Sequence, residues 1–190
     1  MFAVVLDTCV LWPSLQRDFL LSLAVEGLYR PLWSEPILAE LEHCEAAKLV
    51  DRGEDPRTAE VRTRRLIATV KSAFDDALVE NWEPYEGTFG LPDPYDEHVL
   101  AAAVVGNAGA IVTDNIRHFP RSAVPEQIQI LRPAEFAADT VSVSPDAALR
   151  AIKAMSGRYR NPPRTIEEML ELLISRYDMA EAVGLIRSVR

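Results

Sequence analysis

The sequence predicts an α/β fold in which helices flank a parallel sheet, followed by a small all-helical C-terminal appendage. Two short apolar segments, residues 2–6 and 110–112, lack the alternation of a half-exposed strand, so we interpret both as buried strands. Helical patterns lie between these two segments. Beyond Thr140 the chain contains only helical patterns, which predicts domains at residues 1–139 and 140–190.

Three helices and a short strand are expected after the first strand. Ser34 suits the N-cap of the second helix and Pro36 its first turn, because serine accepts from exposed backbone N–H groups and proline has none to leave unpaired. The predicted helices cover residues 18–28, 37–50 and 56–79, and the strand covers residues 32–33.

The stretch from residue 91 to residue 120 is the most informative part of the chain. Asp93 and Pro94 suit the start of a helix, and Gly106 suits its end. The apolar strand that follows leads directly into a polar segment. The predicted elements from here on are helix 99–105, strand 110–112, strand 128–131 and helix 133–138.

The C-terminal appendage is expected to begin with a linker, VSVSPD at residues 141–146, which ends in a Ser-Pro helix start. Thr165 and Glu168 form a capping-box pattern at a later helix start. Residues 150–164 are basic with no acidic residue, so the appendage could bind RNA, a partner protein or a second copy of the chain. We predict helices over residues 145–155, 166–174 and 179–189.

The composition limits the classes of protein to consider. No apolar run in the 190 residues approaches the roughly 20 that a membrane helix needs, and the N-terminus lacks a signal-peptide pattern. Cys9 and Cys44 are too few for a disulfide framework. We therefore expect a cytoplasmic protein without membrane association. The net charge of −9 argues against binding nucleic acid by bulk electrostatics, but acidic metal ligands would contribute to that charge.

Two of the carboxylates stand where predicted strands end. Asp7 follows the first strand, and Asp114 follows the strand at 110–112 after Thr113. If these strands are parallel neighbours, both side chains emerge at the edge where open α/β sheets bind ligands. Like charges held together are costly unless a cation or a proton shares them, and a hard divalent cation prefers oxygen ligands. The sequence therefore predicts a site for Mg²⁺ or Mn²⁺.

The known motifs for other chemistries are absent from the sequence. It contains no Gly-rich phosphate loop, no GxSxG elbow, no HExxH and no zinc-ligand spacing. An acidic metal site suits phosphodiester hydrolysis, since the metal lowers the pKa of bound water and neutralises charge on the leaving oxygen. Spacing alone does not choose Glu40 over Glu42 as a further site residue. Asp93 is expected mainly to cap its helix, whereas Asp96 could cap and bind metal at once.

Four segments of the chain resemble the PIN-domain family, specifically the VapC-type toxin ribonucleases. These segments are VVLDTCVL at the start, WSEPILAEL at 33–41, DPYDEHVLAAA at 93–103 and IVTDNIRHFP at 111–120. They occur in family order over roughly residues 2–131, and the tail from about residue 140 resembles the helical extension of a VapC subgroup. The resemblance implies a PIN-like fold and Mg²⁺- or Mn²⁺-dependent endoribonuclease activity on structured RNA such as tRNA or rRNA. It also implies a cognate antitoxin and a homodimer.

Carried over residue by residue, the resemblance selects Glu40 over Glu42 and pairs it with Asp7 and Asp96. The fourth acidic position departs from the common Thr-x-Asp pattern, so either Asp114 or Asn115 fills it. The expected catalytic residues are Asp7, Glu40, Asp96 and Asp114, of which Asp7, Asp96 and Asp114 would hold metal. Thr113, Asn115 and Asp93 would support them. The expected RNA contacts are Arg62, Arg65, Arg117, His118, Arg158 and Arg160.

Two hypotheses remain beside the ribonuclease. A PIN-fold module without catalysis would bind RNA or a protein and keep its carboxylates for folding, and Asn115 together with the acidic net charge favours it. A flap-type DNA nuclease would cleave branched DNA, but the short chain offers no arch or clamp for that substrate.

Overall fold

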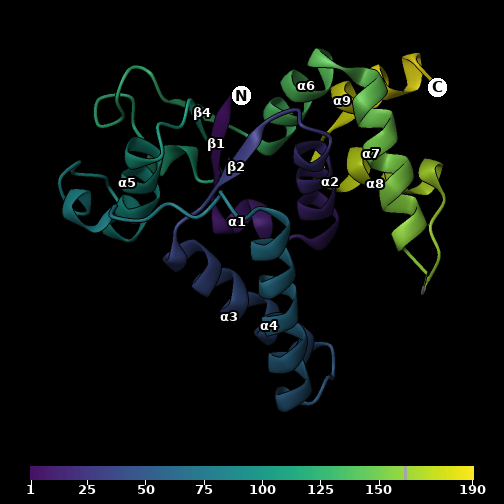
Figure 1. The fold of residues 1–190 in the computed structure, drawn as a ribbon, viewed down its shortest axis with the longest axis horizontal. Helices are drawn as coiled ribbons and strands as arrows, with labels where there is room; N and C mark the ends of the chain where they lie inside the picture. The colour runs from purple at the N-terminus through teal and green to yellow at the C-terminus, as the bar shows by residue number, and fades with distance from the viewer. Residues whose placement is uncertain (161) are drawn as a thin grey trace.

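The computed structural model describes residues 1–160 and 162–190, and its centre is a parallel sheet with helices on both sides (Figure 1). The strands lie in the order β2-β1-β3-β4, so the two strands expected to end in aspartates are direct neighbours. Val5 pairs with Leu32 on one side and Ile111 on the other. The predicted α/β fold is confirmed. The strands are β1 (Ala3–Leu6), β2 (Arg30–Leu32), β3 (Ala110–Val112) and β4 (Gln129–Leu131).

The central strands are buried on both faces. Val4, Val5 and Leu6 have no exposed surface, and neither has any residue of β3. Helix α5 covers one side of the sheet, whereas α2 and the C-terminal helices lie on the other (Figure 1). This burial explains why the sequence of β1 shows no apolar–polar alternation.

The N-terminal helices pack around the carboxyl ends of the strands, and α3 with α4 forms a projecting hairpin (Figure 1). The prediction of a helix over 18–28 was wrong at both ends, because the helix begins at Ser14 and Gly27 leaves it with φ +78°. The helix expected to reach Val79 ends at Ala73, where the chain extends so that Leu78 bridges to Trp33. The helices are α1 (Thr8–Leu11), α2 (Ser14–Val25), α3 (Glu35–Asp51) and α4 (Pro56–Ala73).

Helix α5 begins where the capping pattern predicts. The Asp93 carboxylate accepts the backbone N–H of Tyr95, which starts a short 3-10 turn that runs into α5. Ser34 occupies the N-cap position of α3, but its side chain makes no capping hydrogen bond there. The elements of this region are η1 (Glu83–Tyr85), η2 (Pro94–Asp96), α5 (Glu97–Val105) and η3 (Ile116–His118).

Four helices follow the sheet, and the expected linker at 141–146 is wrong. Helix α6 continues to Val143 because Thr140 and Val141 are buried, and Ser144 directly caps the next helix by accepting the N–H of Ala147. The predicted domain boundary after residue 139 falls inside α6. No helix of the described residues is long and apolar enough to cross a membrane. The helices are α6 (Pro133–Val143), α7 (Pro145–Arg158), α8 (Ile166–Tyr177) and α9 (Ala180–Ser188).

Replacing Thr165 with alanine is expected to destabilise the chain by about 1 kcal/mol, because Thr165 and Glu168 form the predicted capping box reciprocally. Urea unfolding of the variant would measure this loss. Thr69→Ala on the exposed face of α4 is the matched control, since its hydroxyl only bonds back to the Arg65 carbonyl. Equal stability of wild type and Thr165→Ala would contradict the prediction.

Candidate active site

Asp7 lies at the carboxyl end of β1 and is held by the loop that follows the neighbouring strand. Its carboxylate is buried, at 4% exposure for the residue, and its Oδ2 accepts the Thr113 hydroxyl at 2.6 Å and the Cys9 thiol at 3.2 Å. The Asp7 backbone N–H also donates to the Val112 carbonyl. One carboxylate oxygen is therefore fixed by two donors.

The loop after β3 wraps around this carboxylate. Fully buried Thr113 accepts the N–H of Asn115 at 3.0 Å, and the N–H of Asp114 donates to the Cys9 sulfur at 3.3 Å. Burial raises the pKa of the Asp114 carboxyl, Arg132 opposes this, and the charge of Asp7 adds to the increase. Asp114 thus lies close enough to Asp7 for the two carboxylates to repel each other. The choice between Asp114 and Asn115 as the fourth ligand stays a prediction.

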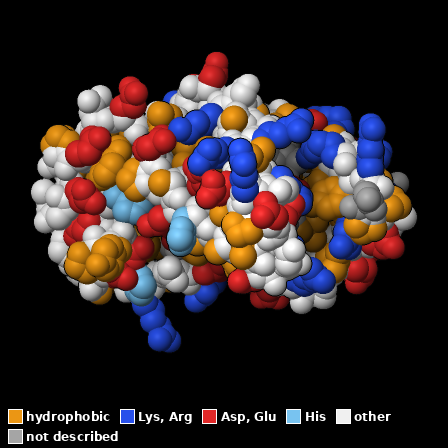
Figure 2. Space-filling model, turned by 90° about the horizontal axis from the view of Figure 1, so that it is seen from below, with side chains coloured by type: hydrophobic (Ala, Val, Ile, Leu, Met, Phe, Trp, Pro, Cys, Tyr) orange, Lys and Arg blue, Asp and Glu red, His pale blue; other side chains and the backbone are white. Residues whose placement is uncertain are grey.

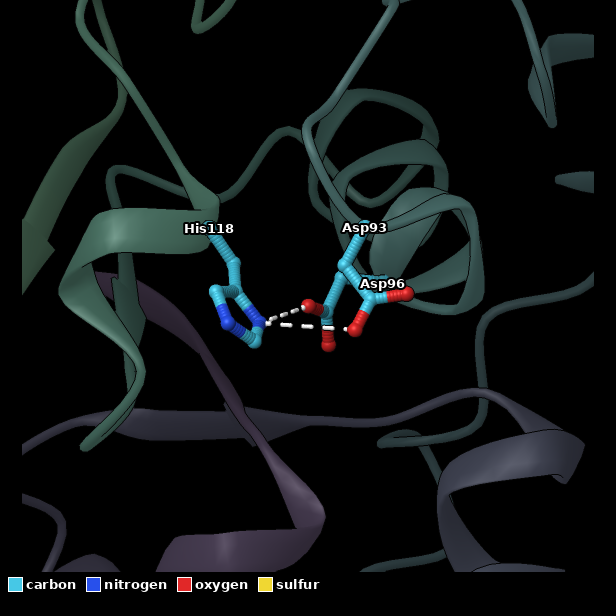
Figure 3. A group of neighbouring side chains, drawn as sticks. All are labelled: Asp93, Asp96 and His118. Atoms are coloured by element: carbon cyan, nitrogen blue, oxygen red, sulfur yellow. Dashed lines mark hydrogen bonds and ion pairs between the residues drawn. The ribbon is translucent and has the colours of Figure 1, made fainter.

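Asp96 comes to the same region from the start of α5. Its Oδ2 lies 2.6 Å from Nδ1 of His118, and Oδ2 of Asp93 lies 3.7 Å from the same nitrogen (Figure 3). One ligand atom from each of these three residues lies within 4.8 Å of the others. Burial raises the pKa of Asp96, the hydrogen bond from His118 lowers it, and the charge of Asp7 raises it. Asp96 and Asp7 therefore repel each other across the site.

Glu40 reaches the site from α3, whereas Glu42 does not. The Thr8 hydroxyl, directly after Asp7, donates to Oε2 of Glu40 at 2.8 Å. The His98 imidazole lies 3.7 Å from the other carboxylate oxygen and lowers the pKa of Glu40, with burial acting in the opposite direction. Glu42 instead faces Arg64 on α4. This geometry supports the choice of Glu40.

Three residues in direct contact with the site were not predicted to belong to it. Thr8 and His98 both contact Glu40, and Cys9 donates to Asp7. Burial and the neighbouring Asp7 raise the pKa of Cys9 to about 12, so its thiol stays protonated and can donate. Thr8 and Cys9 follow Asp7 immediately, and His98 stands two residues after Asp96. Their nearness to Asp7 and Asp96 in the sequence is the feature that could have predicted their place in the site.

The six residues expected to contact RNA do not form one surface. They lie on α4, on η3, at the last residue of α7 (Arg158) and in the segment after it (Arg160). Arg62 is paired with Glu54 through two contacts of 2.7 and 2.8 Å, and Arg158 donates to the Ser22 hydroxyl. Residue 161, inside the predicted basic segment, lies outside the described residues. Only His118, through Asp96, contacts the acidic centre by the hydrogen bonds and ion pairs found among the described residues.

The donors of the site fit a divalent cation. Asp7, Asp96 and Asp114 carry carboxylate oxygens, which suit Mg²⁺ and Mn²⁺, and burial together with the charge of Asp7 raises the pKa values of Asp96 and Asp114. Glu40, bonded to Thr8 and beside His98, lies where it can orient a water molecule. The imidazole of His118 already bonds Asp96, so it can orient that ligand.

Comparison with known proteins agrees with this architecture. Residues 3–117 match the PIN domain model, and residues 133–187 match the model of the VapC50 C-terminal domain. The chain is 42% identical over 79 residues to a Mycobacterium tuberculosis protein named "Putative ribonuclease VapC50", and the match covers 41% of this chain and 47% of that relative. No solved structure shows significant similarity. The match to the PIN domain model covers more than half of the chain, so the chain belongs to the PIN-domain family.

Proposed function

We propose that the chain is a Mg²⁺- or Mn²⁺-dependent endoribonuclease that hydrolyses structured RNA and acts as the toxin of a type II toxin–antitoxin pair. One observation carries the proposal. In a PIN-domain chain, the charge of Asp7 at the end of β1 raises the pKa values of Asp96 and Asp114, and Thr8, directly after Asp7, donates to Glu40. The printed name of the relative, which includes "ribonuclease", supports RNA as the substrate.

In this proposal the side chains have separate tasks. Asp7, Asp96 and Asp114 hold the metal, directly or through water, and Thr113 with Cys9 fixes the orientation of Asp7. When bound, the metal supplies an activated water and neutralises charge on the departing oxygen. Glu40 orients the attacking water and is itself held by Thr8. Asp93 starts the turn that presents Asp96, as its bond to Tyr95 indicates.

The proposed partners follow from the family. RNA of the tRNA or rRNA class would be the substrate, a cognate antitoxin would inhibit the chain, and the active form would be a homodimer in the cytoplasm. The VapC name of the relative supports the toxin role. Oligomeric state and antitoxin are testable by light scattering and by co-purification with the product of a neighbouring gene.

Removal of metal is expected to abolish RNA cleavage. The test is incubation of the purified, antitoxin-free chain with total RNA in Mn²⁺, in Mg²⁺ and in EDTA, with Mn²⁺ binding measured by calorimetry on the same sample. Discrete cuts that need metal support the proposal. Cleavage that persists in EDTA would contradict it. Neither cleavage nor metal uptake would favour the module without catalysis.

Replacing His118 with asparagine is expected to weaken Mn²⁺ binding and cleavage by about 10- to 100-fold, because a residue that orients a metal ligand has effects of this size. Calorimetry and initial cleavage rates would measure the two losses. Excess Mn²⁺ should restore most of the rate. His43→Asn on α3 controls for the loss of a histidine outside the site. If cleavage is lost completely and excess Mn²⁺ does not restore it, His118 would instead contact the RNA directly.

A further inference from the structure

A groove separates the C-terminal helices from the first helices of the PIN domain. Trp12 and Pro13 line one side, together with Lys48 of α3 and Arg52 just after that helix. Arg164 and the end of α8 line the other side. A second pocket shares Pro13, Arg176 and Tyr177 with the first. The two pockets are therefore adjacent, and together they are here called the seam groove.

The seam groove leads to the acidic centre. Its second part is lined by Asp114 and by Arg132, which lies close enough to lower the pKa of that aspartate. A chain lying in the groove would therefore pass from the C-terminal helices to the proposed metal ligands. The face of the molecule that carries the carboxyl edge of the sheet shows most lysines and arginines from the centre toward the C-terminal half (Figure 2).

The arginines of the seam groove have no acidic partner in the part of the chain that the structure describes. Among the residues that the structure describes, no carboxylate lies within ion-pair distance of Arg52, Arg132, Arg164 or Arg176. Asp114 and Asp178 are the carboxylates that line it in the described parts. On the basic helix α4, by comparison, Arg62, Arg64 and Lys71 are paired with glutamates, whereas Arg57 and Arg65 have no ion pair among the described residues. Four arginines without ion pairs that line one groove, in a chain of net charge −9, suit an anionic ligand.

Aromatic rings line the same groove as these charges. Trp12 is 43% exposed, and Tyr159 and Tyr177 are half-buried along the same groove. Aromatic faces stack on bases of single-stranded nucleic acid, and neighbouring cations follow the phosphates. The guanidinium group of arginine suits phosphate in particular, because it can donate two parallel hydrogen bonds to it. An acidic peptide would use the cations, but its carboxylates would be repelled by Asp114 and the acidic centre to which the groove leads.

We propose that the seam groove binds a single-stranded segment of RNA that flanks the scissile phosphate. Arg52, Arg164 and Arg176 would contact phosphates, Arg132 the phosphate nearest the acidic centre, and Trp12 would stack on a base. The proposal rests on the ribonuclease function above. It assigns the C-terminal helices a part in holding substrate, with Arg164 and Arg176 as their contribution.

The test is binding of a fluorescein-labelled single-stranded RNA in EDTA, followed by anisotropy at several salt concentrations. The double variant Arg164→Gln/Arg176→Gln is expected to weaken binding and to reduce the slope of log K against log salt by about 1.4, since each lost phosphate contact on a single strand removes about 0.7. The control is Arg57→Gln/Lys153→Gln, which removes the same charge outside the groove. Equal losses in both variants would overturn the proposal.

Trp12 gives a second, uncharged readout. Trp12→Ala is expected to weaken RNA binding by about 5- to 150-fold with an unchanged salt slope, because stacking on a base is worth about 1–3 kcal/mol. Trp12→Phe keeps an aromatic face and should retain most of the affinity. Wild-type affinity in Trp12→Ala would contradict the stacking role. Circular dichroism of each variant checks that it is folded.

The outcomes separate this inference from the ribonuclease itself. If the protein cleaves RNA with metal but the groove variants bind RNA as wild type does, the ribonuclease proposal is retained and the proposed role of the seam groove is wrong. Loss of poly-glutamate binding in Arg164→Gln/Arg176→Gln, with RNA binding intact, would assign the groove to an acidic protein instead. Absence of RNA binding by wild type would count against both proposals.

Discussion

Replacing Asp7 with asparagine is expected to reduce metal-dependent RNA cleavage by about 10³-fold or more. Asp7 has the most buried carboxylate of the four proposed catalytic residues, and asparagine keeps its shape while removing the charge that would hold the cation. Loss of several kcal/mol of metal-derived stabilisation corresponds to a rate loss of this size. Initial rates on the RNA cut by wild type, with Mn²⁺ present, would measure it.

The Asp7→Asn variant should remain folded. Thr113 can still donate to the amide oxygen, and removal of one of several repelling charges relieves the electrostatic cost of the site. The pKa values of Asp96 and Asp114 should fall in the variant, because the charge of Asp7 raises both, and NMR titration of the metal-free protein would show this. Glu42→Gln, on the same helix as Glu40 but facing α4, is the activity control. Wild-type cleavage by Asp7→Asn would mean that the cuts come from a contaminant or from another site.

Replacing Glu45 with alanine is expected to destabilise the protein by about 3–5 kcal/mol, the largest effect on stability that we predict. Glu45 and Arg17 are both 5% exposed, and Oε1 of Glu45 lies 2.7 Å from Arg17 and 2.5 Å from Lys48. Arg17 also donates to the Leu11 carbonyl. The variant would leave the Arg17 charge buried without this partner, and the melting temperature should fall by about 6–20 °C.

The control for Glu45→Ala is Glu35→Ala, which breaks the exposed pair between Glu35 and Lys71 and should cost less than about 1 kcal/mol. Urea unfolding would compare the two. A loss below about 1 kcal/mol for Glu45→Ala would show that Arg17 is neutralised by another group, with Asp18 at 3.7 Å the nearest candidate. The pair joins α2 to α3, so its loss should also reduce cleavage by displacing Glu40.

Local features of the sequence predicted the sheet and its polar edge. The unbroken apolar run of β1 required burial on both faces, and that burial places Asp7 at the sheet edge. The cap at Asp93 and the box at Thr165 depend on residues two or three positions apart, so the sequence displays them directly. The extent of α6 was missed because burial of Thr140 and Val141 depends on the fold and leaves no mark in local propensity.

The sequence by itself determined the strand that ends in Asp7 and the helix start that carries Asp96, because these depend on neighbours along the chain, and the burial pattern of the strands predicted the fold class. Only the tertiary structure decided which side chains hold the carboxylates. The bond from Thr113 reaches Asp7 across more than a hundred residues of sequence separation, and the Cys9 thiol, close to Asp7 along the chain, contacts the same hydroxyl. The tertiary structure also decided which arginines have an acidic partner, because folding brings that partner from a distant part of the sequence.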